Sequence, residues 1–405
     1  MRWDTRADGR SRAFVELARK AAALQPDSPA SWVLLARSLT RAGAHDEALS
    51  VLTEATARRP DSPQLQLMLA TACCRDGNFD LARQVLARTP AIPSDDGALA
   101  LSRLRIEMEV TPARDAVGLA REALALDPTC GTALEILGLE AVRAGSPDIM
   151  LPVCQAALTR QPGHARACYE LAHAYARLGR ADDARQLIDL HRFVTVTDLS
   201  PPEEYADATT FEAALAREIT TYPTLKPDPA GLTTQGGFQT AIDLDRTVDG
   251  ALSVLFDQIQ AGVGAFIARL PDGSADPFVQ ACPGEAALKA WAVVCPADGH
   301  QLTHIHPSGW LSGVYYVSVP EPAGDDPSGG CLMLGGRSEL DIDEDPPWGT
   351  RIHRPVRGQM ILFPSCIPHA TVPTRSAGLR ISVAFDVVPT DPADDTRPDA
   401  RRQSP

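Results

Sequence analysis

The spacing of apolar residues changes about halfway along this chain of 405 residues. Up to about residue 190, apolar and small residues recur three and four positions apart, which is the spacing of one helix face. From about residue 225, apolar residues stand in short runs rich in valine, isoleucine and tyrosine, and turn residues separate these runs. We therefore predict a helical N-terminal half and a β-rich C-terminal half.

The helical half repeats itself every 34 residues. Four positions recur in phase, with Ser94, Leu104, Thr111 and Met150 as exceptions. The residues in phase are Pro26, Pro60, Pro128 and Pro162; Gly43, Gly77, Gly145 and Gly179; Ala36, Ala70, Gly138 and Ala172; and Ala48, Ala82, Ala116 and Ala184. Glycine suits the end of a first helix, alanine lets a second helix approach it, and proline ends that second helix. The pattern predicts a helix–turn–helix unit that is stacked about five times between residues 10 and 190.

The stretch 30–60, which includes Trp32, carries the whole pattern and resembles a tetratricopeptide repeat. Such repeats stack into a superhelix with a concave face. The resemblance implies that the array binds a peptide or protein, or that it associates with itself, as in a homodimer. The alternative is an array that only spaces or supports the next domain.

In the β-rich half, one helix is predicted over residues 249–270. Short β-prone runs follow it, and turn residues bound each of them. These runs are 289–296, 300–307, 310–320, 329–336, 358–365, 369–373 and 379–388. Runs of this length and spacing predict an antiparallel sandwich or barrel.

Two of these runs carry residues suited to metal chemistry. His304 and His306 are two positions apart, so in a strand both side chains lie on one face and can reach one ion. His369 is the candidate for a third ligand. Arg380 and Ser382 also share a strand face, and a buried guanidinium there would pair with a carboxylate.

Together these features resemble the double-stranded β-helix of 2-oxoglutarate- and Fe(II)-dependent dioxygenases, and more narrowly the bacterial oxygenases that follow tetratricopeptide repeats. The likeness covers 233–388 and is carried by 233–240, 291–320 and 358–373. It implies Fe(II) as the metal, 2-oxoglutarate as the cosubstrate and O₂ as the oxidant of a hydroxylase. The implied site residues are the metal ligands His304, His306 and His369 and the cosubstrate contacts Tyr316, Arg380 and Ser382.

The sequence departs from this family at one ligand. Where the superfamily that it resembles usually has Asp or Glu, this chain has His306, which favours a three-histidine site of the kind found in some cupins. Loss of the ligand's negative charge should weaken Fe(II) binding. The alternative is that a carboxylate from Asp341, Asp343 or Asp345 completes the site.

The expected fold is multidomain α + β, with a tetratricopeptide-repeat superhelix followed by a jelly-roll, cupin-like double-stranded β-helix. The expected boundaries are 1–190 for the repeats, 191–224 for a connector, 225–390 for the oxygenase domain and 391–405 for a disordered tail. Pro201 and Pro202 suggest the break between the two halves.

Charge and composition exclude several classes of partner and compartment. The net charge is −14 and there is no basic run, so neither a nucleic acid nor an anionic membrane is expected as a partner. No apolar run approaches the roughly 20 residues that span a bilayer, and the first residues lack an apolar signal core. The nine cysteines are interpreted as buried thiols in a reducing cytoplasm.

Two other functions compete with the oxygenase. One is a repeat adaptor with a degenerate barrel, which four retained site residues, His304, His306, His369 and Arg380, argue against. The other is a three-histidine cupin-type enzyme that does not use 2-oxoglutarate. The presence of Arg380 and Ser382 on one face of a strand argues against it.

Overall fold

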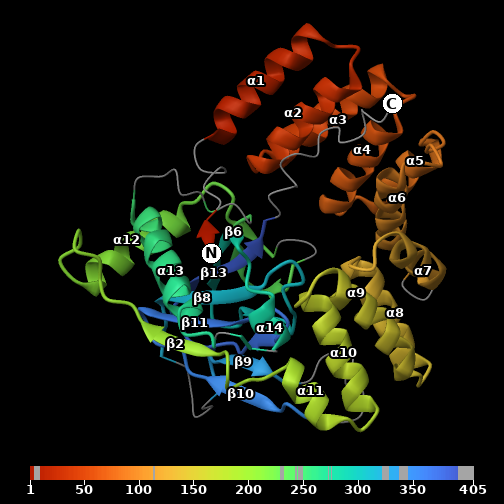
Figure 1. Ribbon diagram of the computed structural model, residues 1–405. Helices are drawn as coiled ribbons and strands as arrows, with labels where there is room; N and C mark the ends of the chain where they lie inside the picture. The colour runs from red at the N-terminus through yellow and green to blue at the C-terminus, as the bar shows by residue number, and fades with distance from the viewer. Residues whose placement is uncertain are drawn as a thin grey trace.

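The computed structural model describes residues 1–3, 10–112, 115–228, 232–241, 244, 250–271, 273–274, 276–321, 328–336 and 345–390. The expected tail, 391–405, lies outside this range, as do Asp341 and Asp343. Among the described helices, none is long and apolar enough to cross a membrane. The chain forms a curved helical array that arches around one side of a β domain (Figure 1).

The array consists of one leading helix and five helix pairs. Its helices are α1 (Arg10–Leu24), α2 (Pro29–Arg41), α3 (His45–Arg58), α4 (Pro63–Arg75), α5 (Phe79–Arg88), α6 (Gly97–Val110), α7 (Val117–Leu126), α8 (Gly131–Arg143), α9 (Met150–Arg160), α10 (Ala165–Arg177) and α11 (Ala181–Leu187). This confirms the predicted repeat and its phase.

The in-phase residues have the roles that their chemistry predicts. Gly43, Gly77, Gly145 and Gly179 follow the first helix of their units and all have positive φ, between 62° and 73°. The in-phase alanines of the second helices are buried where the paired helices meet. Each in-phase proline lies two positions after the end of a helix, where it prevents the helix from continuing.

The β domain is built mainly from one large sheet. Its strands, in spatial order, are β2 (Thr195–Asp198), β11 (Gln359–Pro364), β8 (Leu311–Ser318), β13 (Arg380–Pro389), β6 (Glu285–Cys295), β5 (Phe238–Gln239) and β3 (Lys226–Pro227), and β1 (Arg2–Trp3) pairs with β6. Helices α12 (Ala208–Thr220) and α13 (Ala251–Ile267) cover its outer face (Figure 1), and their apolar residues share one core with that face. The short helix α14 (Pro277–Gln280) precedes β6.

Two smaller sheets face the inner side of the domain. One has the order β10 (Thr350–His353), β9 (Leu332–Gly335), β12 (His369–Thr371), and the other pairs β4 (Thr234–Gln235) with β7 (His300–Gln301). Helix α10 closes one side of the space between the sheets, because Tyr169 and Ala172 share a buried cluster with Leu332 and Tyr316. These layers agree with the predicted antiparallel jelly-roll fold.

The structure differs from the sequence-based prediction in two places. Residues 191–224, expected to be a connector, contain β2, which pairs antiparallel with β11, and α12, whose Phe211, Leu215 and Ile219 are buried against the large sheet. The run 300–307, predicted as one strand, is regular only over β7. Beyond β7 the chain bends at Thr303, and successive backbone N–H groups donate to different segments: that of Leu302 to Thr233 O, that of His304 to His369 O and that of His306 to Ser365 O.

Candidate metal centre

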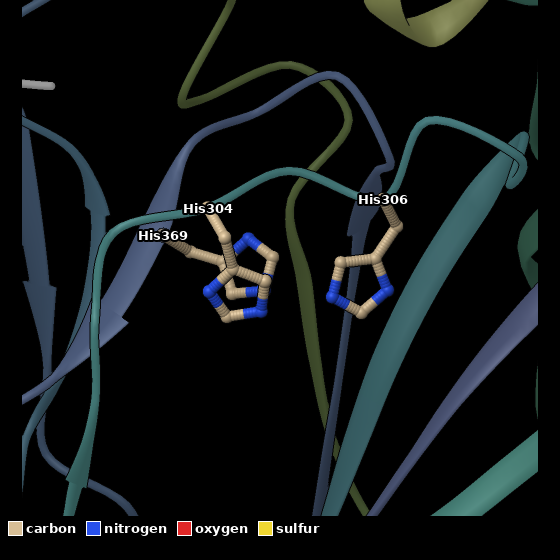
Figure 2. Close-up of side chains that lie close together, drawn as sticks. All are labelled: His304, His306 and His369. Carbon is tan, nitrogen blue, oxygen red and sulfur yellow. The ribbon is translucent and has the colours of Figure 1, made fainter. Parts of the chain in front are cut away.

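Sheet geometry brings three imidazoles together at the start of β12. His304 and His369 form an isolated antiparallel bridge and exchange both backbone hydrogen bonds, of 3.0 and 2.9 Å. His306 is two positions further on, and its N–H donates to Ser365 O at 3.1 Å. Directly paired residues and residues two apart point to one side of a sheet, so the rings gather there (Figure 2). The ring centroids are 4.3 Å apart for His304–His369, 4.9 Å for His306–His369 and 5.1 Å for His304–His306.

Each ring is fixed through its Nδ1 atom. His304 Nδ1 is 2.7 Å from Leu302 O, and His369 Nδ1 is 3.0 Å from Ile367 O. His306 Nδ1 is 2.6 Å from Oδ1 of Asp386. Carbonyl and carboxylate oxygens accept, so each Nδ1 is the donor and each Nε2 keeps its lone pair for an ion.

The residues present fit a metal ion. One possible ligand atom from each of the three rings lies within 4.8 Å of the others. Imidazole nitrogens bind zinc at about 2.1 Å, so two of them at right angles on such an ion are about 3 Å apart. Small rotations of the three rings would therefore bring their nitrogens to the spacing that one ion requires. Among the described residues, these three histidines are the group of His, Cys, Asp or Glu side chains that lie close enough together to hold a metal ion. Asp345, the described member of the alternative carboxylates, is exposed and does not belong to the group.

Burial keeps two of the rings neutral. The pKa of His304 is lowered to about 4, mainly by burial and then by the neighbouring His306. The pKa of His369 is lowered well below its usual value by burial and by both other rings. Since a protonated imidazole cannot bind a metal, these shifts leave both nitrogens available at neutral pH.

A buried positive charge lies near the imidazoles, because Arg380 contacts Thr371, two positions after His369 on β12. Arg380 begins β13 with 3% of its surface exposed. Its guanidinium donates to Thr371 Oγ1 at 2.8 Å, to Val372 O at 3.2 Å and to Gly330 O at 3.4 Å. These acceptors are neutral, and no carboxylate of the described residues is in contact with it. A buried charge is costly without a counter-charge, so the position suits an anionic ligand.

Both polar and apolar side chains lie near Arg380 on the inner face of the large sheet. Ser382 is directly opposite Tyr316 in the pairing of β13 with β8, and both residues are buried. Burial raises the pKa of Tyr316, so its hydroxyl stays protonated. An apolar cluster of Trp291, Val293, Cys295 and Ala384 lies on the same face. The structure thus brings all six predicted site residues into one region.

Sequence reasoning missed Asp386 and Ser312. Asp386 is on the β13 face that carries Arg380 and Ser382, six positions after Arg380. Its Oδ1 accepts from Ser312 Oγ at 2.7 Å as well as from His306. The period-two alternation of β13 is the signal that would have placed it on the inner face.

A cleft of about 1000 Å³ separates the array from the β domain. Its array side includes Gly97, Leu101 and Arg160, and its β side includes Arg2 and Glu285. Glu285 is on the face of β6 that carries Trp291, six positions away, or about 20 Å along the strand. The cleft is therefore at the end of β6 far from the residues beside the metal centre.

Comparison with protein families gives matches in both halves. Residues 289–386 match the family described as "Putative 2OG-Fe(II) oxygenase". Tetratricopeptide-repeat models match residues 6–63 in one case and residues 39–104 and 143–195 in another. No curated protein matches the chain.

Solved structures resemble the two halves separately. A prolyl-4-hydroxylase of Pseudomonas putida is 16% identical, with a TM-score of 0.34, over 53% of this chain and 99% of that one. YrrB, described as a repeat protein with an unusual peptide-binding site, is 17% identical, with a TM-score of 0.36, over 44% of this chain and 95% of that one. These similarities are distant and assign no activity to the chain.

The three-histidine cluster and the buried arginine both belong to the stretch that the oxygenase family model matches. The helix pairs coincide with the matches to the repeat models. The chain thus carries tetratricopeptide repeats in its N-terminal half and a 2-oxoglutarate/Fe(II) oxygenase domain in its C-terminal half.

Proposed function

We propose that this protein is a 2-oxoglutarate- and Fe(II)-dependent dioxygenase that hydroxylates a peptide or protein presented by its repeat array. The observation that carries the proposal is the arrangement of charged and metal-binding side chains on the inner face of the sheet. Three imidazoles with free Nε2 atoms lie near a buried guanidinium that has no anionic partner among the described residues.

In this proposal each inner residue has a defined task. His304, His306 and His369 hold the iron, and Arg380 pairs with the far carboxylate of 2-oxoglutarate. Ser382 and Tyr316 lie beside that carboxylate and can donate hydrogen bonds to it. The apolar wall around Trp291, Val293 and Ala384 excludes water from the reacting end.

The overall reaction balances without a further oxidant. One O₂ and one 2-oxoglutarate convert a substrate C–H into C–OH and leave succinate and CO₂. Bound Fe(II) would supply the activation of O₂. The protein's own residues fix the ligand geometry, orient the cosubstrate and keep water out.

The cosubstrate role of Arg380 is tested by Arg380→Ala. We expect 2-oxoglutarate affinity, measured by calorimetry on metal-loaded protein, to fall at least tenfold, because a charge-assisted bidentate pair is lost. Metal content should remain near one ion per chain. Arg351→Ala is the matched control, because Arg351 also donates to a backbone carbonyl, that of Leu190, and is not among the proposed site residues. Equal loss of metal and cosubstrate in Arg380→Ala would contradict the assigned role.

The cleft between the two halves is the proposed route for the substrate. Helix α10 already packs against the β domain through His173, whose ring centroid is 4.9 Å from that of Trp348. The last repeat unit thus packs against the chain's own β domain, and we expect the earlier units to bind the partner. The cleft lies between these units and the start of β6, the strand that carries Trp291 beside His306.

Two glycines provide a matched test of this route. Gly97 and Gly131 begin the first helices of adjacent units, and a Cβ at either would meet nothing within 4 Å. Gly97 lines the cleft, and Gly131 is not among its lining residues. We expect Gly97→Trp to lower oxygen incorporation into a degenerate synthetic peptide library several-fold, as read by mass spectrometry, and Gly131→Trp to leave it unchanged. Equal incorporation by Gly97→Trp and the unaltered protein would refute the route.

A further inference from the structure

We propose that Asp386 is a positioning residue that holds His306 toward the metal. Its hydrogen bond to the ring also brings to the site the negative charge that a directly bound carboxylate would supply. This inference rests on the proposed function, because it assigns His306 to the iron. It concerns a site in which all three candidate ligands are neutral imidazoles, so none of them brings a negative charge to the ion.

The first support is a charge-assisted hydrogen bond. His306 Nδ1 donates to Asp386 Oδ1 at 2.6 Å, with 10% and 13% of the two side chains exposed. The other two rings donate to the neutral backbone carbonyls of Leu302 and Ile367. Of the three imidazoles, His306 therefore has the anionic acceptor. A carboxylate in this place raises the basicity of the ligating nitrogen and fixes the ring orientation.

The second support is that the carboxylate is itself held in place. Asp386 is directly opposite Ser312 in the pairing of β13 with β8, and Ser312 Oγ donates to Asp386 Oδ1 at 2.7 Å. Ser312 Oγ is in turn 2.8 Å from Ser365 Oγ. Ser365 also accepts the backbone N–H of His306 through its carbonyl oxygen. The side chain and the backbone of His306 are thus tied to one network.

The third support is tight packing on both sides of the pair. A Cβ on Gly309 would lie 2.4 Å from Ser365 Oγ and 3.4 Å from Asp386 Cγ, so the turn after His306 packs directly onto the network. On the other side, the Trp291 ring centroid is 5.3 Å from that of His306. His306 has little room to turn its Nε2 away from the cluster.

The alternative is that Asp386 itself binds the ion or serves only the fold. Its Oδ1 already accepts from two donors, and Asp386 is not in the group suited to hold a metal. A ligand would act whether or not His306 is present, and a positioning residue acts only through His306. This difference decides the design of the test.

The experiment measures Co(II) affinity of the metal-free protein by competition with a chromophoric chelator, with no 2-oxoglutarate added. We expect Asp386→Asn to weaken Co(II) binding about 10- to 100-fold, the usual effect of losing a ligand's orienting partner. The visible spectrum of bound Co(II) should shift, because the donor strength of one imidazole changes. Ser312→Ala, which removes one donor and keeps the carboxylate, should have a smaller effect of the same sign.

Asp198→Asn is the matched control, because Asp198 also accepts a side-chain hydrogen bond, from Gln359 at 2.9 Å, away from the metal centre. A double-mutant cycle with His306→Ala completes the test. The proposal expects Asp386→Asn to have no further effect once His306 is absent. An unchanged Co(II) affinity in Asp386→Asn, or an undiminished effect in the His306→Ala background, would overturn it. Failure of the unaltered protein to bind Co(II) would instead refute the proposed function.

Discussion

At the scale of single residues, the metal centre combines neutral imidazoles with a buried positive charge. Burial holds His304 and His369 neutral, and the acceptors of Arg380 among the described residues are neutral. Both features are costly in a protein without ligands. They become favourable when a cation and a carboxylate bind together, which is why this site suits a metal and a dicarboxylic acid.

The lowered pKa of His369 predicts how stability depends on pH. Its folded pKa lies well below that of the unfolded chain, so the unfolded state binds more protons and stability falls as pH drops below about 6.5. Between pH 7 and pH 5 this one group should remove about 2 kcal/mol from the free energy of unfolding of the metal-free protein. His369→Gln should abolish that share of the loss, as measured by urea unfolding at both pH values. An identical pH dependence in the variant would show that His369 is not held neutral.

The sequence identified those site residues that follow a short local pattern. His304 and His306 alternate within one run, and Arg380 and Ser382 alternate within another, so their shared faces follow from strand geometry. Asp386 escaped notice because its partner is 80 positions away in sequence. Only the pairing of β13 with β8 and the turn after His306 bring the two together.

At the scale of elements, the large sheet needs the segment that precedes the predicted oxygenase domain. Strand β2 extends the sheet beyond β11, and α12 covers part of its outer face. Pro201 and Pro202 do break the chain, but they lie between two elements of the same domain. The sequence predicted a connector over 191–224 around this break, and β2, with four residues of which two are exposed, gave little signal of a strand.

The role of α12 is tested by Phe211→Ala. Phe211 is 1% exposed, and its ring centroid is 4.8 Å from that of Tyr205. Truncation should lower the free energy of unfolding of the β domain by about 3–5 kcal/mol. Denaturant titration followed by tryptophan fluorescence measures this, and exposed Thr209→Ala on the same helix serves as control. A loss no larger than that of the control would mean that residues 191–224 are a connector after all.

At the scale of the whole molecule, the array and the β domain are in extensive contact. Arg185 Nε donates to Pro347 O at 2.9 Å, and the thiol of Cys366 donates to Leu187 O at 3.7 Å. The 34-residue period predicts the array itself because each unit contacts its neighbours in sequence. It carries no signal for these contacts, which join residues far apart in the chain.

Two glycines with the same backbone conformation test this coupling. Gly145 and Gly163 have φ of 62° and 69°, so alanine at either is strained by about 1 kcal/mol. At Gly145 a Cβ would meet nothing within 4 Å, and at Gly163 it would lie 2.3 Å from Cβ of Ala281 in the β domain. We expect calorimetry to show a further loss of about 1–3 kcal/mol for Gly163→Ala, from overpacking of the contact. Equal losses would indicate that the two halves are not docked at this point.

The most direct test of the central claim is an anaerobic titration of the Fe(II)-loaded protein with 2-oxoglutarate, followed in the visible spectrum. If three imidazoles hold the iron and Arg380 anchors the cosubstrate, a weak charge-transfer band should grow to saturation. In Arg380→Ala the band should require a much higher concentration of 2-oxoglutarate. Tightly bound iron without any cosubstrate-dependent band, or the same titration curve in Arg380→Ala, would contradict the account.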